Sequence, residues 1–241
     1  MTQAQFSPFP LRARESKNAG MDKQAEHHLV YFADPMCSWC YGFAPVITAL
    51  ADHFGERLPV DVVMGGLRAG NTEPMRQKDK DYIRSAWTRV NEASGQPFDF
   101  RFLDREGFVY DTEPACRAVV TVRTLAPRIA LRFKESVSRA FYSEGRDTTK
   151  AQVLAVLAGE AGVERARFET AFAAPEVHNE TLRDFMTAQQ LGVQGFPTLI
   201  AGSRRTREYA IVTNGYRPLD GLPDALDRWL EAKAAKSGAP G

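Results

Sequence analysis

Apolar and polar positions alternate along the chain in a way that separates strand-like from helix-like stretches. Compact apolar runs at residues 29–33 and 58–64 are typical of buried strands, and Gly65 with Gly66 ends the second run. Residues 41–50 between them carry apolar side chains at helical spacing after a short turn. The first part of the chain is therefore predicted to be a strand, a helix and a second strand.

A long stretch from about Thr72 to Gly192 has helical periodicity and little strand character. Thr149 with Gln152 predicts a capping box for one of its helices, and Pro175 predicts the start of the last one. We predict five helices, whose apolar stripes lie at residues 82–90, 116–122, 129–141, 153–157 and 182–186.

Strand-like sequence returns at residues 198–201 and 209–213, and a closing amphipathic helix is predicted after Pro218. The resulting fold class is α/β, with β-α-β and β-β-α halves separated by a large all-helical insertion. The predicted divisions are a flexible extension at 1–27, a sheet domain at 28–72 and 193–235, an inserted helical domain at 73–192, and a frayed tail at 236–241.

Composition excludes several classes of partner. The 241 residues are 44% hydrophobic, enough to bury a full core, and the 31 basic residues nearly balance the 30 acidic ones. We therefore expect neither nucleic acid nor a membrane as partner. The first 28 residues have no apolar run typical of a secretory signal, so we expect a cytoplasmic protein. Its three cysteines do not form a disulfide scaffold.

Cys37 and Cys40 are the strongest chemical signal in the sequence. The spacing of three residues places both sulfurs on one face of a helix, close enough to form a reversible disulfide. Cys37 is predicted at the helix N-terminus, where unpaired N–H groups and the helix dipole stabilise the reactive thiolate. A zinc site is disfavoured because the sequence has no second CxxC and no close Cys/His pair. Redox chemistry is the favoured interpretation.

Four motifs together resemble the DsbA-like branch of the thioredoxin superfamily, and within it the predicted cytoplasmic disulfide-isomerase (FrnE-like) group. The resemblance covers about residues 28–235. The motifs are Asp34-Pro35-Met36-Cys37-Ser38-Trp39-Cys40-Tyr41-Gly42-Phe43, Met64-Gly65-Gly66-Leu67, Thr112-Glu113-Pro114-Ala115-Cys116 and Gly195-Phe196-Pro197-Thr198.

The resemblance implies a thioredoxin fold and a set of roles. Cys37 is the expected nucleophile and Cys40 the resolving thiol. Pro197 is the expected cis-proline facing the cysteines, and the Phe196 backbone is expected to pair with an extended substrate. Trp39 either covers the helix end or helps to bind apolar substrate.

Three further residues are expected to modulate the pair. Ser38 and Trp39 differ from the dipeptides of well-known family members, and without a histidine there we expect a moderately lowered Cys37 pKa and a less oxidising potential. Asp34 is either a turn residue or a carboxylate that raises the thiol pKa or shuttles a proton. Thr112 is expected to cap a helix, with a role at the site as the alternative. Cys116 is expected to be a buried apolar residue, a third redox thiol being the alternative.

The predicted function is thiol–disulfide oxidoreductase or isomerase, acting on disulfide-containing proteins or on glutathione. We expect no metal or nucleotide cofactor, since the protein's own disulfide is the redox group, and glutathione is a candidate co-substrate. A homodimer stays open. The rivals are a glutathione-dependent transferase or isomerase of the kappa-class or 2-hydroxychromene-2-carboxylate isomerase type, and a non-catalytic, chaperone-like peptide-binding protein. Retention of both cysteines favours dithiol redox chemistry.

Overall fold

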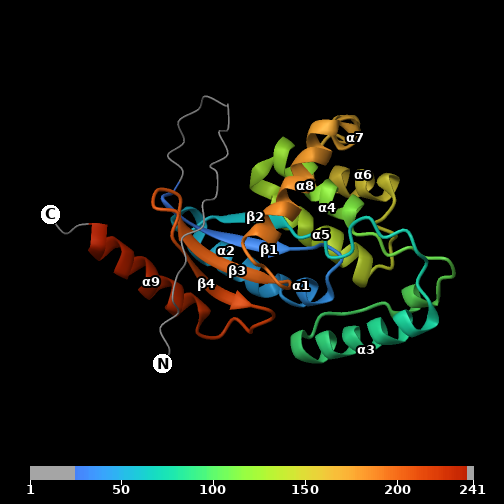
Figure 1. Cartoon of the computed structure of the whole chain (residues 1–241), viewed down its shortest axis with the longest axis horizontal. Coiled ribbons are helices and arrows are strands. Elements are labelled where there is room, and N and C mark those ends of the chain that lie inside the picture. The colour runs from blue at the N-terminus through green and yellow to red at the C-terminus, as the bar shows by residue number, and fades with distance from the viewer. Residues whose placement is uncertain (1–24, 238–241) are drawn as a thin grey trace.

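The computed structural model describes residues 25–237 and contains one four-stranded mixed sheet surrounded by helices (Figure 1). The predicted β-α-β and β-β-α halves, separated by helices, are confirmed. In chain order the elements are β1 (His27–Ala33), α1 (Ser38–Gly42), α2 (Ala44–Phe54), β2 (Val60–Met64), α3 (Gln77–Ser94), α4 (Glu113–Leu125), α5 (Ala130–Tyr142), α6 (Ala151–Glu160), α7 (Arg165–Ala173), α8 (Pro175–Gln190), β3 (Thr198–Ser203), β4 (Tyr209–Asn214) and α9 (Leu222–Ser237).

The sheet has the strand order β2-β1-β3-β4, so the first strand of the chain is central. β1 pairs with β2 in parallel, with Leu29 opposite Val60, and pairs with β3 antiparallel, with Phe32 opposite Thr198. The β1–β3 pairing brings the segment after Ala33 beside the segment before Thr198. Two motifs that are about 160 residues apart in sequence thus meet at one end of the sheet.

Side chains of β1 are buried on both faces of the sheet, which explains why this strand reads as a continuous apolar run. Leu29, Tyr31 and Ala33 belong to the main core, which extends into α2, α4 and α5. Val30 and Phe32 belong to a smaller cluster completed by α8 and β3. The strand that leads to Cys37 is therefore held by packing on both faces.

Six of the helices among the described residues, α3 to α8, form the inserted segment. Five were predicted; α7 was missed because its pattern is weakly amphipathic and Phe168 and Phe172 are its only buried residues. The predicted capping box is wrong: Lys150 is the N-cap residue of α6, and the Thr149 hydroxyl donates instead to Asp147 Oδ1 at 2.6 Å.

The inserted helices pack directly on the sheet half. α3 and α5 contact α1, and α4, α5 and α8 contact β2. Arg123 of α4 and Asp184 of α8 form a buried ion pair, in which Arg123 Nη1 lies 2.6 Å from Asp184 Oδ2. Asp184 Oδ2 also accepts the Met64 N–H of β2. The main core is continuous across both parts, and the predicted domain division stays a prediction.

At its ends the chain differs slightly from expectation. α9 continues to Ser237, past residue 236 where the tail was predicted to begin. Most of the predicted extension at 1–27, and residues 238–241 of the tail, lie outside the described residues.

Candidate active site

The first turn of α1 presents Cys37 at the junction between sheet and helix. Cys37 is the N-cap residue with an extended backbone, φ −95° and ψ 117°, and its carbonyl accepts the Tyr41 N–H at 3.0 Å. Its own N–H donates to the Asp34 carbonyl at 3.1 Å, which closes the turn that follows β1. The predicted position of Cys37 at the helix N-terminus is confirmed.

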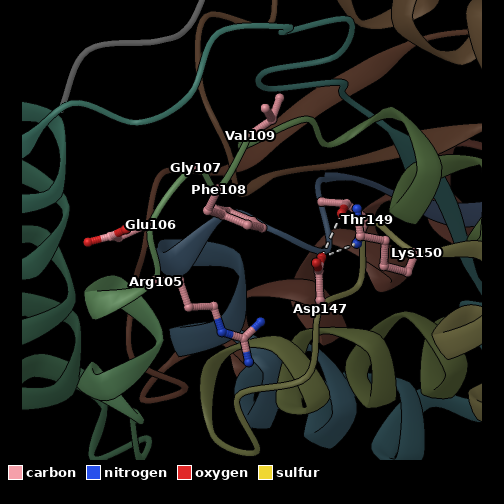
Figure 2. Close-up of a pocket in the computed structure, with 8 residues that line it drawn as sticks. All are labelled: Arg105, Glu106, Gly107, Phe108, Val109, Asp147, Thr149 and Lys150. Carbon is pink, nitrogen blue, oxygen red and sulfur yellow. Dashed lines mark hydrogen bonds between the residues drawn. The ribbon is translucent and has the colours of Figure 1, made fainter.

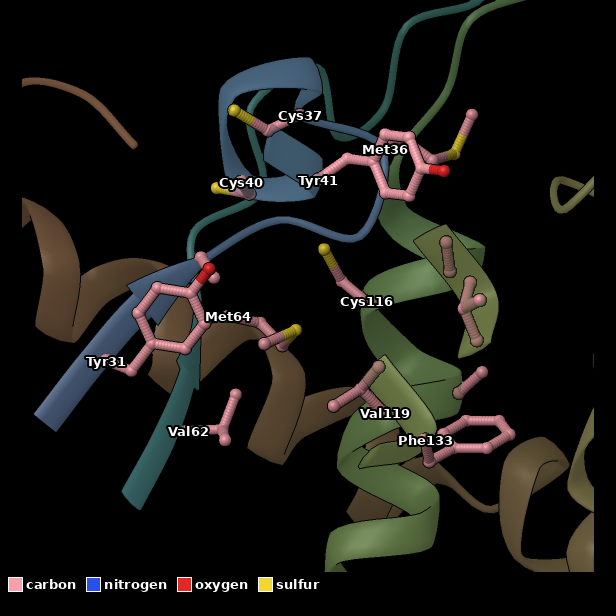
Figure 3. Packing of buried hydrophobic residues seen from close by; sticks show 14 of the residues in the cluster. Tyr31, Met36, Cys37, Cys40, Tyr41, Val62, Met64, Cys116, Val119 and Phe133 are labelled. Atoms are coloured by element: carbon pink, nitrogen blue, oxygen red, sulfur yellow. The ribbon is translucent and has the colours of Figure 1, made fainter. Parts of the chain in front are cut away.

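Cys37 and Cys40 are free thiols with different degrees of burial: Cys37 is 5% exposed and Cys40 is fully buried (Figure 3). The Cys40 thiol lowers the pKa of Cys37 by hydrogen bonding to it, and the Cys40 backbone N–H lowers it further against the opposing effect of burial. Burial, followed by the hydrogen bond and charge of Cys37, raises the pKa of Cys40 well above its usual range. The pKa values of the two thiols are therefore shifted in opposite directions.

The segment before β3 closes over Cys37. The Phe196–Pro197 peptide bond is cis, and the Phe196 carbonyl oxygen lies 3.5 Å from Cys37 Sγ. The Phe196 ring sits so close to Gly65 that a Cβ there would lie 2.0 Å from its Cζ. The lack of a side chain at Gly65 therefore lets this loop approach the cysteines.

Asp34 is fully buried beside the cysteines and has more partners than a turn residue needs. Its Oδ1 accepts the Met36 N–H at 2.8 Å, and its Oδ2 accepts the Leu67 N–H at 2.7 Å and the Cys116 thiol at 3.4 Å. Burial raises the pKa of Asp34, although the hydrogen bonds from Met36, Thr112 and Leu67 oppose this. Its negative charge in turn raises the pKa of Cys37.

Thr112 is the N-cap residue of α4, as expected, but its side chain makes no cap hydrogen bond. Its hydroxyl instead accepts the Arg68 N–H at 3.1 Å and hydrogen-bonds Asp34, which joins the start of α4 to the site. Cys116, one turn further along α4, is fully buried as expected, and burial raises the pKa of its thiol well above the usual range. An inserted helix thus contributes two groups beside Asp34.

Ser38 and Trp39 lie between the cysteines and are both half-buried. The Trp39 ring packs against Tyr216, with centroids 5.6 Å apart, and the Tyr216 hydroxyl donates to the Ala93 carbonyl of α3 at 2.9 Å. Trp39 is thus held against a residue that follows β4, and both alternatives for its role, covering the helix end and contacting substrate, stay predictions.

Sequence reasoning missed three residues below Cys40. Lys134 of α5 is fully buried, and its Nζ lies 3.3 Å from both the Cys40 carbonyl oxygen and Glu135 Oε1. Its ammonium lies 5.4 Å from the centre of the Tyr31 ring. The only available signal was that Lys134 follows Phe133 inside the apolar stripe of this helix.

A hollow of about 270 Å³ lies elsewhere on the inserted segment (Figure 2). It is lined by polar and apolar groups of residues 105–109 together with Asp147, Thr149 and Lys150. The predicted site residues do not line it. Among residues 25–237, no helix is both long and apolar enough to cross a membrane.

The arrangement of a helix-end cysteine pair facing a cis-proline loop agrees with a family comparison. The family model described as DSBA-like thioredoxin domain matches residues 28–227. The chain belongs to this family. The predicted resemblance and the predicted fold class, a thioredoxin fold with a helical insertion, are thereby confirmed.

Solved structures of family members align over most of the chain. A Nitrosomonas europaea protein, proposed to be a protein disulfide isomerase, is 38% identical with a TM-score of 0.80, and the match covers 86% of this chain and 98% of that one. The cytosolic disulfide reductase DsbM from Pseudomonas aeruginosa is 27% identical with a TM-score of 0.70 at the same coverages. DsbM is also known in a structure with glutathione.

Two proteins of lower sequence identity are also similar to this chain. The ClpXP adapter protein SpxH of Halalkalibacterium halodurans is 22% identical over 191 residues, and this chain spans only 62% of its length. A 2-hydroxychromene-2-carboxylate isomerase structure is 18% identical with a TM-score of 0.61, covering 86% of this chain and 98% of that one. At that identity the likeness concerns the fold alone.

Proposed function

We propose that the protein is a cytoplasmic thiol–disulfide oxidoreductase or isomerase that uses Cys37 and Cys40 on disulfides of proteins or of glutathione. The observation that carries this is the placement of Cys37 Sγ, at the N-terminus of α1 and 3.5 Å from the Phe196 carbonyl oxygen beside cis-Pro197. The likeness to a cytosolic disulfide reductase, also solved with glutathione, supports the compartment and the thiol partner.

The proposed reaction has two exchange steps. The Cys37 thiolate attacks one sulfur of a substrate disulfide, forms a mixed disulfide and releases the other sulfur as a thiolate that takes up a proton. Cys40 then loses its proton and attacks Cys37 Sγ, which forms the Cys37–Cys40 disulfide and releases the second substrate thiol. Two molecules of glutathione, a small-thiol reductant, would return the pair to the dithiol form and leave as oxidised glutathione. Isomerisation ends instead with attack by a second substrate thiol on the mixed disulfide.

The Phe196 backbone is the proposed docking edge for an extended substrate. Its carbonyl already lies beside Cys37 Sγ, and Pro197 has no N–H with which to compete for substrate carbonyls. The redox group is the protein's own disulfide, so we propose no metal or organic cofactor.

Trapping tests this proposal against its rivals. Cys40→Ser is expected to accumulate a stable mixed disulfide with oxidised glutathione or with a model disulfide peptide, detected as an added mass that dithiothreitol removes. Cys37→Ser is expected to form none, and Cys116→Ser, which removes a thiol outside the pair, is expected to accumulate none because Cys40 still resolves the adduct.

The rivals give different outcomes. A glutathione transferase or isomerase would keep its turnover in Cys40→Ser, and a binding protein would keep peptide affinity in Cys37→Ser while wild type forms no mixed disulfide. A wild-type protein that forms no reversible Cys37–Cys40 disulfide in graded glutathione buffers would contradict the proposal directly.

A further inference from the structure

Two buried side chains of the inserted segment bind the backbone of the turn that leads into α1. The Ser138 hydroxyl of α5 donates to the Pro35 carbonyl at 2.8 Å, and the Tyr110 hydroxyl donates to the Met36 carbonyl at 2.6 Å. Ser138 is fully buried and Tyr110 is only 4% exposed. The two carbonyls belong to the two peptide groups that precede Cys37, on the turn shown in Figure 3. The insertion therefore holds the chain directly before the proposed nucleophile.

Tyr142 of α5 extends this contact into a chain of hydrogen bonds. Its hydroxyl oxygen lies 3.1 Å from the Tyr110 hydroxyl oxygen. Because the single Tyr110 hydroxyl proton is donated to the Met36 carbonyl, Tyr142 is the donor to Tyr110. Burial raises the pKa of both tyrosines, so both keep their protons at neutral pH. The chain therefore runs in one direction, from Tyr142 through Tyr110 to the turn, and hydrogen bonds in such a chain strengthen one another.

The rings of the two tyrosines are themselves fixed by packing. The centre of the Tyr110 ring lies 5.5 Å from that of Phe141. The Tyr142 ring stacks on Tyr41, with centroids 5.1 Å apart and planes inclined by 15°. Tyr41 directly follows Cys40, so Tyr142 contacts the chain on the other side of the cysteine pair as well. Rings held in this way leave the two hydroxyls little freedom to move.

The position of the turn decides where the Cys37 sulfur lies. Asp34, from the sheet half, accepts the N–H groups of Met36 and Cys37, so the turn has polar partners on both sides. Cys37 Sγ lies 3.5 Å from the Phe196 carbonyl oxygen, which belongs to the proposed docking edge. A substrate strand paired with that edge presents its disulfide at a fixed place, and a sulfur displaced from that place reacts more slowly.

We propose that Tyr110 and Ser138 are positioning residues that hold the turn before α1 so that Cys37 meets a disulfide docked on the Phe196 backbone. The proposal rests on the proposed function and concerns its first step, the attack by Cys37. Both hydroxyls act through the backbone of the turn and not on the substrate sulfur. Ionisation of Cys37 does not depend on them, because hydrogen bonding by Cys40 lowers the pKa of Cys37.

Two substrates separate positioning from the intrinsic reactivity of the thiolate. One is an extended peptide that carries a disulfide, and the other is dithiobis(nitrobenzoate), a small aromatic disulfide with no backbone to pair with Phe196. In Tyr110→Phe we expect exchange with the peptide to be about 10-fold slower than in wild type, and exchange with the aromatic disulfide to change by less than about twofold. The pH profile of iodoacetamide alkylation, which reports the pKa of Cys37, should be unchanged.

Ser138→Ala provides a second variant, because Tyr110→Phe leaves the buried Met36 carbonyl without its donor and can fold poorly. Ser138→Ala removes the donor to the Pro35 carbonyl. We expect the same pattern, slower exchange with the peptide and an unchanged alkylation profile, but a smaller effect because Ser138 binds one peptide group further from the nucleophile.

Thr181→Val is the matched control. Thr181 is fully buried, and its hydroxyl donates to the Val177 carbonyl at 2.8 Å within α8, with no link to the turn. Removing this hydroxyl should leave exchange with both disulfides at the wild-type rate.

The outcomes separate this proposal from the proposed function. Peptide exchange at the wild-type rate in both variants, equal slowing with both disulfides, or a shifted alkylation profile would overturn the positioning role. The same slowing in Thr181→Val would also overturn it, since the effect would then follow from the loss of any buried hydroxyl. A wild-type protein that exchanges with neither disulfide would instead mean that the proposed function is wrong.

Discussion

The sheet half and the inserted helices contribute different kinds of group to one site. The sheet half supplies the sulfurs and the loop that faces them: Cys37 and Cys40 on α1, and Phe196 with Pro197 before β3. The inserted helices supply the polar surroundings, with Thr112 and Cys116 beside Asp34 and Lys134 beside Cys40.

The two parts therefore differ in what they bring to the site: the sheet half carries the two sulfur atoms, and the inserted helices carry polar groups that lie around them. Cys37, Cys40, Phe196 and Pro197 lie on short segments attached to β1 and β3, two strands buried on both faces, where packing fixes their positions. Of the surrounding groups, Thr112 and Cys116 belong to one of the four motifs, whereas Lys134 lies in a segment without a motif. Under the proposed function the insertion takes part in the chemistry as well as in the architecture, and we expect changes at the contact between the two parts to affect the cysteines.

The largest effect is expected from breaking the buried ion pair of the insertion, whose Asp184 also accepts the Met64 N–H of β2. Arg123→Met leaves Asp184 without its cation, and the side chains of the pair are only 11% and 6% exposed. We expect a loss of about 3–5 kcal/mol in the free energy of unfolding, measured by chemical denaturation.

An exposed ion pair between the insertion and the sheet half provides the control. Arg132 of α5 and Asp52 of α2 lie 3.6 Å apart, with side chains 77% and 63% exposed. Arg132→Met should cost less than about 1 kcal/mol. Equal losses for both variants would show that the buried pair has no special part in holding the insertion to the sheet.

A smaller effect is expected where the cis-proline loop meets the strand end. Gly65→Ala would place a Cβ 2.0 Å from Phe196 Cζ, so the ring must move. We expect the loop that carries Phe196 to shift with it. We expect a cost of about 1–3 kcal/mol, typical of overpacking, and a several-fold slower disulfide exchange. Gly195→Ala, whose Cβ would meet nothing within 4 Å, is the control. An unchanged exchange rate in Gly65→Ala would show that the loop position does not limit exchange.

The smallest effect is expected at Asp34, where both parts meet. Asp34→Asn removes a negative charge that raises the pKa of Cys37, so the pKa of Cys37 should fall. Iodoacetamide alkylation of Cys37 would therefore begin at lower pH than in wild type. Asp111→Asn, at an exposed acceptor of the Gly70 N–H, is the control.

Asp34→Asn is also expected to change how the free energy of unfolding depends on pH. The pKa of Asp34 is raised by burial, so the protonated form is favoured in the folded protein and stability falls as pH rises through the folded pKa. Asn cannot ionise, and this decrease should be absent from Asp34→Asn. An unchanged pH dependence of unfolding would show that the pKa of Asp34 is the same in the folded and the unfolded protein.

Much of the site was readable in the sequence because local rules govern it. The CxxC spacing places two sulfurs on one turn of helix, and the preceding apolar run predicts the strand that carries them. The roles of Cys37, Cys40, Phe196 and Pro197 were implied by motif resemblance and now rest on the trapping test. The polar neighbours were harder, since Thr112 looked like a helix cap and turned out to hydrogen-bond Asp34 and the Arg68 backbone.

The sequence by itself determined the order of elements, the cysteine pair and the family, because hydrophobic period, helix-end chemistry and short motifs are local properties. Tertiary structure alone decided which distant groups surround the sulfurs. Lys134 lies 94 residues after Cys40 and meets its carbonyl only because α5 packs against α1. No period or spacing in the chain encodes that contact; it follows from how two apolar faces fit together, and a buried charge takes whatever environment that fit creates.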